Sequence, residues 1–207
     1  MKLSRLTLAT VLVLTAATFA RRGAFAIAEQ VDGQPAAARS GTMPTLPKDA
    51  PYDLKFIDAM SKHHRSAIEM ATMAHSTLQH TGLKKLAGQI PVDQQREIAR
   101  MKLWRDRWYK GLPVIGGDPT LSGMGADMDM SQMKMMKPGR DYDAMFIDMM
   151  VTHHERAVAM SRAALASAEH QEIKTLAQQI IDAQSKEIEE MRQWKASLGP
   201  PAPGSGH

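Results

Sequence analysis

Cysteine is absent from this chain of 207 residues. The chain therefore forms no disulfide and offers no thiolate to a metal. Methionine is abundant instead, with 17 residues, so thioether sulfur is the soft ligand that remains. Soft ligands select Cu(I) among the common biological metals. Methionine also fills gaps in hydrophobic cores, so the positions of the methionines along the chain must separate the two roles.

The start of the chain lacks an apolar run long enough to cross a bilayer. Residues 6–20 form an uncharged, mostly apolar run of 15 residues, whereas a spanning helix needs roughly 20. Lys2 and Arg5 precede this run and Ala24-Phe25-Ala26 follows it, a pattern typical of a cleaved secretory signal. We therefore expect a mature N-terminus near Ile27, a periplasmic or secreted protein, and no stable membrane span after cleavage.

The net positive charge of the chain comes from this predicted signal peptide. Residues 1–26 contain four basic residues and no acidic residue, so their removal takes the formal charge from +4 to 0. Nucleic-acid binding depends on clustered Lys and Arg, so the sequence predicts no nucleic-acid partner. The remaining residues, about 180, are enough for one well-buried domain.

An internal duplication organises the rest of the chain. Residues 52–104 align without gaps with residues 142–194, with 22 identities among 53 pairs. Within each copy, mostly apolar residues recur at steps of three and four in two stretches, as in Phe56, Met60 and Ala67 with His63 between them, which predicts two amphipathic helices. We expect the helices of each copy to be separated near residues 80–82 and 170–172. Pro91 stands where the second copy has isoleucine and predicts a kink or a delayed helix start.

These patterns predict an all-α protein. A single hairpin of this size leaves one apolar face uncovered, so we expect the two tandem hairpins to form an antiparallel four-helix bundle with a pseudo-twofold axis. The predicted segments are a signal peptide at 1–26, a flexible linker at 27–50, hairpins at 51–109 and 141–198, a methionine-rich crossover at 110–140 and a disordered tail at 199–207.

A polar layer is predicted inside this bundle. If each hairpin turns near residues 80 and 170, His63 faces Glu97 and His153 faces Glu187, with Met60 opposite Met101 and Met150 opposite Met191. Two interpretations stay open. One is a closed hydrogen-bond network that sets the register of the bundle. The other is a metal site with His and Met ligands, which acid would weaken because imidazole has a reference pKa of about 6.5. The candidate ligands in the bundle are Met60, His63, His64, Met70, Met101, Met150, His153, His154, Met160 and Met191, and the candidate supporting or alternative ligands are Gln94, Glu97, Gln184 and Glu187.

The crossover carries six methionines within thirteen residues. They are Met124, Met128, Met130, Met133, Met135 and Met136. Their neighbours are Gly, Asp, Ser, Gln and Lys, which is unlike a core stripe, so we expect solvated thioethers that bind Cu(I) or Ag(I). The alternative is a loop that folds over the bundle and buries some of these methionines.

The pattern Phe-x3-Met-x2-His-His-x2-Ala-x2-Met, followed by Ile-x3-Gln-x2-Glu-Ile-x2-Met-x2-Trp, occurs in both copies. It resembles the family known as domain of unknown function 305, over about residues 51–198. The resemblance implies a ferritin-like helical bundle, export, and copper binding linked to copper resistance through Met and His. It does not imply an enzymatic activity, and we expect no organic cofactor.

The resulting hypothesis is an exported protein that sequesters or shuttles Cu(I), extending to Ag(I). Its expected partners are metal ions and periplasmic proteins that export or accept copper. One alternative is a ferritin-like di-iron or di-manganese oxidoreductase, although only two carboxylates reach the predicted layer where four are usual. Another is a metal-free helical interaction module.

Overall fold

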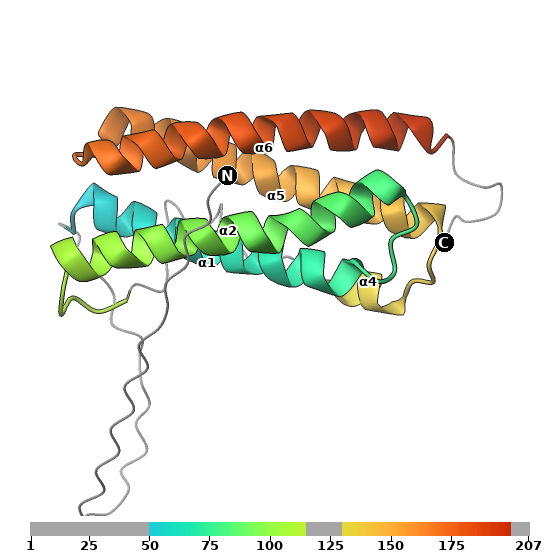
Figure 1. Ribbon diagram of the computed structural model, residues 1–207, viewed down its shortest axis with the longest axis horizontal. Helices are drawn as coiled ribbons and strands as arrows, with labels where there is room; N and C mark the ends of the chain where they lie inside the picture. Colours follow the sequence, from blue (N-terminus) through green and yellow to red (C-terminus); the bar gives the residue numbers. More distant parts are fainter. Residues whose placement is uncertain (1–49, 115–129, 200–207) are drawn as a thin grey trace, which may run out of the picture. The chain divides into compact units, whose positions relative to one another are not determined.

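The computed structural model describes residues 50–114 and 130–199 of the chain. Its elements are α1 (Tyr52–Ala74), α2 (Thr81–Trp108), α4 (Ser131–Met135), α5 (Arg140–Ser167) and α6 (Gln171–Ser197), shown in Figure 1. The predicted all-α four-helix bundle of two tandem hairpins is confirmed. None of these helices is both long and apolar enough to span a membrane. The predicted signal peptide and nearly all of the linker and tail lie outside the described residues, as do Met124 and Met128.

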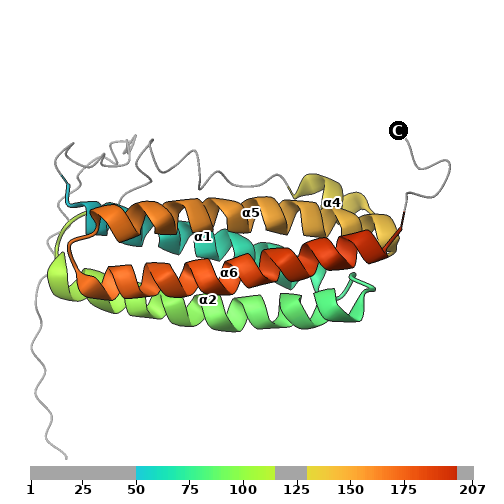
Figure 2. The same ribbon diagram turned by 90° about the horizontal axis from the view of Figure 1, so that it is seen from above.

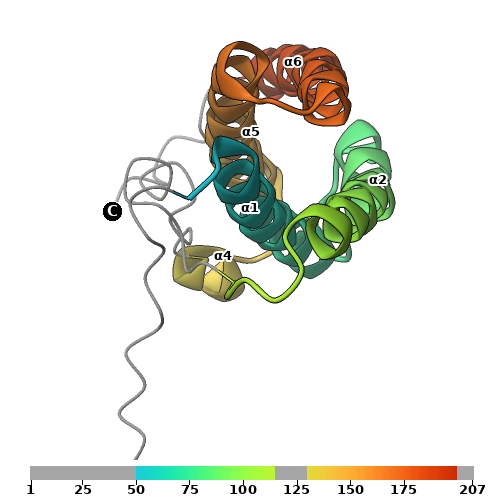
Figure 3. The same cartoon turned by 90° about the vertical axis from the view of Figure 1, so that its left-hand side faces the viewer.

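The two hairpins pack through their first helices. α1 pairs with α2, α5 pairs with α6, and α1 contacts α5 between the pairs. Figures 2 and 3 show α2 and α6 on one side of the α1–α5 pair and α4 on the other side. The α1–α5 contact is therefore the centre of the bundle, and it is where the predicted polar layer should lie.

The start of α2 is set by side-chain caps. α1 ends at Ala74, and the Nδ1 atom of His80 accepts a hydrogen bond of 3.3 Å from the backbone N–H of Leu83. A capping acceptor at this position satisfies one of the N–H groups that the first turn of a helix leaves unpaired. Thr81 and Gly82, expected in the break, are therefore helical, and the break precedes His80.

Pro91 lies inside α2, which runs without interruption from Thr81 to Trp108. The predicted delayed helix start is therefore wrong. A proline in a helix interior costs about 3 kcal/mol. Ile90 and Gln94 are buried on either side of it, so packing of the α2 stripe against the bundle outweighs this local cost.

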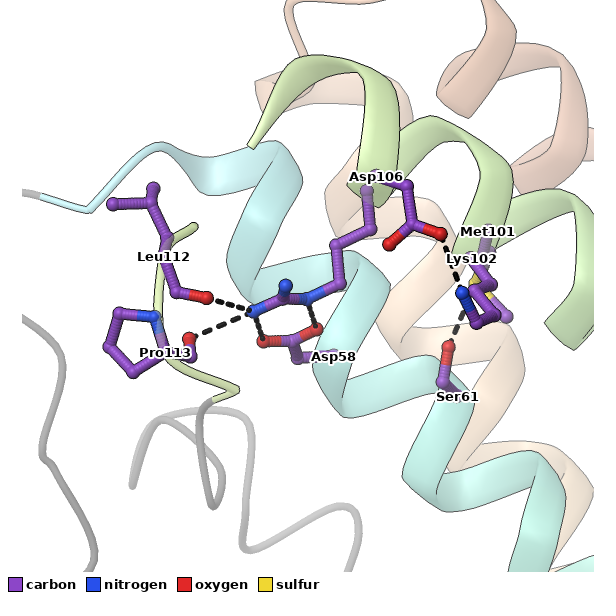
Figure 4. A network of polar contacts seen from close by, with 8 residues as sticks. Asp58, Ser61, Met101, Lys102, Asp106, Leu112 and Pro113 are labelled. Carbon is purple, nitrogen blue, oxygen red and sulfur yellow. Dashed lines mark hydrogen bonds and ion pairs between the residues drawn. The ribbon is translucent and has the colours of Figure 1, made fainter. Parts of the chain in front are cut away.

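An ion pair fastens the end of α2 to α1. Arg105 donates to both carboxylate oxygens of Asp58, at 2.6 and 3.3 Å, and the carboxylate is almost completely buried. The same guanidinium donates to the carbonyl oxygens of Leu112 and Pro113, as Figure 4 shows. This network fixes the chain as it leaves α2, because the planar guanidinium binds all three acceptors at once.

Candidate functional site

Two histidines meet at the centre of the α1–α5 contact. The imidazole rings of His63 and His153 have centroids 3.6 Å apart and an interplanar angle of 37°. Their exposed fractions are 1% and 2%. The duplicated positions thus bring one ring from each hairpin into contact, as expected for residues near a pseudo-twofold axis.

Burial controls the protonation of these two rings. It lowers the pKa of His63 far below the ordinary imidazole value and lowers that of His153 to about 3, and the charges of neighbouring histidines add to both shifts. Both rings are therefore neutral at physiological pH and keep a nitrogen lone pair for a ligand. The expectation that acid protonates this site near the reference pKa is wrong for His63 and His153, because the low-dielectric interior disfavours the charged form.

The neighbouring histidines face the second helix of each hairpin. His64 Nε2 lies 2.6 Å from Glu97 Oε2, and His154 Nε2 lies 2.8 Å from Glu187 Oε2. The predicted pairing of Glu97 with His63, and of Glu187 with His153, is therefore wrong by one residue. One residue turns a helix by about 100°, which separates the face of α1 toward α5 from its face toward α2.

Several buried polar atoms in this layer have no hydrogen-bond partner among the described residues. They are both ring nitrogens of His63 and His153, Nδ1 of His64 and His154, and Oε1 of Gln94 and Gln184. An unpaired buried polar group costs roughly 1–3 kcal/mol, so several such groups together indicate a place for water or a bound ion. Among the described residues, the network of the first interpretation is therefore formed only at His64–Glu97 and His154–Glu187.

Buried thioethers flank the histidines on both sides along the bundle axis. Each of the two core clusters contains three methionines from the four long helices, and the second cluster also contains Met133 of α4. One cluster holds Met60, Met101 and Met160, and the other holds Met70, Met150 and Met191. Repeat-equivalent residues are 90 positions apart, and the repeat equivalent of each methionine in one set belongs to the other set. One sulfur has a contact that the sequence did not predict, since the Ser61 hydroxyl lies 3.8 Å from Met101 Sδ and donates to it (Figure 4).

The layer opens toward solvent between α2 and α6. Residues that line a cavity of about 290 Å³ there include Gln94, Glu97, Gln184 and Glu187. The side chains of Glu97 and Glu187 are 19% and 23% exposed, whereas those of their histidine partners are 0% exposed. Both glutamates therefore lie between solvent and the buried imidazole rings.

The described part of the crossover is less solvated than predicted. Met133 is 1% exposed and belongs to a core cluster, and Met130 and Met136 pack against it. Only Met135, at 79% exposed, stands free among these four. The alternative prediction, a loop that folds over the bundle, therefore describes α4 better, because tertiary contacts bury Met133 despite its polar neighbours.

Across residues 50–114 and 130–199, no three side chains of His, Asp or Glu converge as a ready-made metal site. The histidine layer instead offers its free nitrogens from a close pair of rings and two flanking rings. This donor set fits an ion that accepts few ligands better than one that demands six oxygens.

Comparison with known proteins places the chain in a family. The family profile for a domain of unknown function, DUF305, matches residues 53–195. The chain belongs to the DUF305 family. Among solved structures, the DUF305 protein of Streptomyces coelicolor is 26% identical, with 76% of this chain and 98% of that chain covered and a TM-score of 0.64.

This DUF305 chain is also similar to CopM. The Cu(I)-bound form of CopM is 36% identical, with 72% of this chain and 98% of that chain covered and a TM-score of 0.61. The Ag-bound form obtained by soaking is 36% identical over 70% of this chain and 95% of that chain, with a TM-score of 0.60. A comparison with curated proteins found no match.

Proposed function

We propose that this DUF305 protein binds Cu(I), and Ag(I) as a soft analogue, in the histidine layer of the bundle, and so sequesters or shuttles copper. One observation carries the proposal. His63 and His153 lie in contact with every ring nitrogen buried and unpartnered among the described residues. Their low pKa values keep them neutral, which is the form of imidazole that binds metal.

The flanking histidines match a known pattern of ligand support. A histidine that binds metal through one ring nitrogen commonly gives its other N–H to a carboxylate, which fixes the tautomer and the orientation of the ring. In His64 and His154, Nε2 contacts a glutamate while the buried Nδ1 has no partner among the described residues. Glu97 and Glu187 are therefore supporting residues, and His64 and His154 are ligands with His63 and His153.

The sulfur content supports a soft ion. Six buried methionines flank the layer, and thioether and imidazole together suit Cu(I) better than Mg²⁺ or Ca²⁺. Met60 and Met150 are one helical turn before the histidine pairs and are the nearest thioethers along their helices. Cu(I)- and Ag-bound forms of CopM, at 36% identity, support the same choice of ion.

The rival functions fit the layer less well. A di-iron or di-manganese oxidoreductase of this fold uses four carboxylates in the layer. Here Glu97 and Glu187 are the carboxylates paired to the histidines, and both are engaged by imidazole. A metal-free interaction module gives no reason for eight polar atoms left unpaired within the described part of a small bundle.

The place of action and the crossover complete the proposal. The N-terminal sequence of residues 1–26 supports export, so the metal is handled in the periplasm or outside the cell. Met135, with a highly exposed thioether on α4, is suited to first contact with the ion. Met124 and Met128 belong to the same proposed capture segment, although they lie outside the described residues.

The test is competition for Cu(I) against a colorimetric chelator at pH 7.5, with the mature protein. The variants are His63→Ala/His153→Ala and His64→Ala/His154→Ala, and the matched control is His75→Ala on the exposed end of α1. We expect each double variant to lose at least tenfold in affinity for one copper ion and the control to match wild type.

One outcome would contradict the proposal. If both double variants fold and bind as many Cu(I) ions as tightly as wild type, the histidine layer holds no copper and the proposal is wrong. Metal analysis of protein from its native compartment gives the second check. Paired iron or manganese would favour the oxidoreductase instead.

A further inference from the structure

A second group of methionines lies outside the core, at the end of the bundle where α4 packs. Met145 and Met149 are one turn apart on α5, and Met73 is in the last turns of α1. All three are partly exposed and pack against the core cluster that contains Met133. They are not among the ligands of the histidine layer.

Helix geometry places these three side chains on the side of His63 and His153 that is opposite to His64 and His154. On α5, Met149 and Met145 lie about 40° and 80° from His153, in the rotational sense opposite to His154. On α1, Met73 lies about 80° from His63, again opposite in sense to His64. Since His64 and His154 face α2 and α6, the three methionines face the other side of the α1–α5 pair. Figures 2 and 3 show α4 on that side.

α4 brings its own thioethers to the same face. It contacts α5, and its buried Met133 belongs to the cluster against which Met130 and Met136 pack. Three segments thus contribute six thioethers to one end of the bundle. They are Met73 on α1, Met130, Met133 and Met136 in and around α4, and Met145 and Met149 on α5.

The internal duplication shows which methionines are needed for packing that is common to both repeats. The six buried methionines that flank the histidine layer occur in both repeats, as the pairs Met60/Met150, Met70/Met160 and Met101/Met191. The three outer methionines have no such partner. Their repeat equivalents are Ala163 for Met73, Lys55 for Met145 and Ala59 for Met149. Methionine at these positions is therefore not required by the packing that both hairpins share, and it is confined to the end of the bundle where α4 packs.

The geometry points to a second soft-metal site on this face, in which sulfur atoms drawn from Met73, Met145 and Met149 and from Met130, Met133 and Met136 hold one Cu(I) or Ag(I) ion through sulfur alone. The inference rests on the proposed soft-metal function and adds a site to it. Leu or Ile would cover an apolar face as well as methionine does, whereas only methionine adds a soft donor. Partial exposure leaves these thioethers within reach of an ion arriving from solvent.

The site also links the ion to the position of α4. A helix of five residues is too short to be stable alone, so α4 depends on its contacts with the bundle. An ion shared between α4 and α5 would strengthen those contacts, because binding to the docked form stabilises it. Loading should therefore hold the crossover against the bundle.

The experiment uses the full mature chain and Ag(I), which needs no reductant. The test variant is Met73→Leu/Met145→Leu/Met149→Leu, because leucine keeps the apolar volume and removes the sulfur. The control variant is Ile68→Leu/Leu165→Ile, two partly buried residues that pack against the other core cluster. Equilibrium dialysis counts the bound ions, and Ag X-ray absorption counts the sulfur ligands.

We expect the test variant to lose one Ag(I) equivalent and the number of sulfur ligands per ion to fall, while the control matches wild type. An unchanged ion count with unchanged sulfur ligation in the folded test variant overturns the inference. The His63→Ala/His153→Ala variant separates the two proposals. It should lose the imidazole-bound ion and keep the sulfur-only ion.

A measurement on wild type protects the test against a variant that does not fold. Methionine oxidation by peroxide is mapped by mass spectrometry with and without Ag(I). A sulfur bound to the ion is shielded, so sulfoxide formation at Met73, Met145 and Met149 should slow at least tenfold. Equal oxidation rates at all three positions overturn the inference.

Discussion

Asp53, at the start of the first hairpin, holds His170, at the start of the last helix in the second hairpin. Its buried carboxylate accepts the backbone N–H of His170 at 2.8 Å and contacts the ring Nδ1 at 2.6 Å. The His170 ring stacks on Trp108 with centroids 3.8 Å apart. The repeat equivalent, Asp143, accepts the backbone N–H groups of Gln79 and His80 at 2.9 and 2.8 Å. Each hairpin thus caps a helix of the other.

Loss of this reciprocal cap should destabilise the whole bundle. Asp143→Ala leaves the part-buried N–H groups of Gln79 and His80 without their acceptor, and each such loss costs roughly 1–2 kcal/mol. We expect the free energy of unfolding in urea to fall by about 2–4 kcal/mol, with the slope against urea unchanged. Asp93→Ala, which removes an exposed surface pair with Arg96, is the control and should change it by less than about 0.5 kcal/mol. A loss below about 1 kcal/mol in Asp143→Ala would show that the cap is dispensable.

Two glycines of α2 should respond oppositely to alanine. A Cβ atom on Gly82 would lie 2.7 Å from the indole of Trp194, whereas one on Gly88 would lie 3.5 Å from His75. Gly82→Ala should destabilise the protein by about 1–3 kcal/mol, because the large indole must move. Gly88→Ala should stabilise it by roughly 0.5–1 kcal/mol, since alanine favours a helix interior. Thermal unfolding of both variants gives the comparison, and equal shifts would contradict the close approach of Trp194 to Gly82.

The metal-free bundle should lose stability in weak acid. Because burial lowers the pKa values of His63 and His153, the unfolded chain, with imidazole pKa values of about 6.5, binds more protons than the folded chain below that pH. Their contribution is complete above about pH 6.5 and is lost as the pH falls toward the pKa of about 3 of His153. Each ring should remove roughly 1 kcal/mol per pH unit. Urea unfolding at pH 7.5, 5.5 and 4.5 measures this.

The matched variant for the pH series is His63→Leu/His153→Leu. Leucine removes both titrating groups, so the variant should show a smaller decrease in stability between pH 7.5 and 4.5 than wild type. Identical decreases in the two proteins would mean that other groups govern the acid response.

The supporting glutamates should matter for metal affinity more than for folding. Glu97→Gln/Glu187→Gln keeps the shape of both side chains but weakens the orientation of His64 and His154. We expect a loss of about 10–100-fold in Cu(I) affinity. Glu189→Gln, which alters an exposed contact with Gln193 on the outer side of α6, should leave the affinity unchanged. Copper competition with a chelator decides between these outcomes, and wild-type affinity in the double variant would remove the two glutamates from the site.

Much of the fold could be predicted because two independent patterns agreed. The steps of three and four residues indicate helices, and the duplication indicates that two equal hairpins cover each other's apolar faces. The cap by Asp143 was not predicted, because no local pattern marks it. Asp143 is 64 positions from Gln79 and 63 positions from His80 in the sequence. The identity of Tyr52-Asp53 with Tyr142-Asp143 is the only trace of it in the sequence.

The buried polar layer was predicted in composition but not in register. The predicted facing positions depended on where each hairpin turns, and a shift of one residue exchanged His63 for His64 as the partner of Glu97. Such a shift is invisible in helical periodicity, because both histidines are buried, one against α5 and one against α2. The burial of Met133 was also beyond reach, since its local sequence is polar and only tertiary contacts cover it.

The reciprocal cap has the form of a subunit interface. Each hairpin supplies one acidic side chain and one receiving loop, which is the self-complementary arrangement of a twofold homodimer, here joined in a single polypeptide. In a true homodimer every residue appears twice, so neither subunit can differ from the other. Fusion removes that constraint. The second hairpin therefore has Met145 where the first has Lys55, and α4 packs on α5 at one end of the bundle. The histidine pairs are the same in both hairpins.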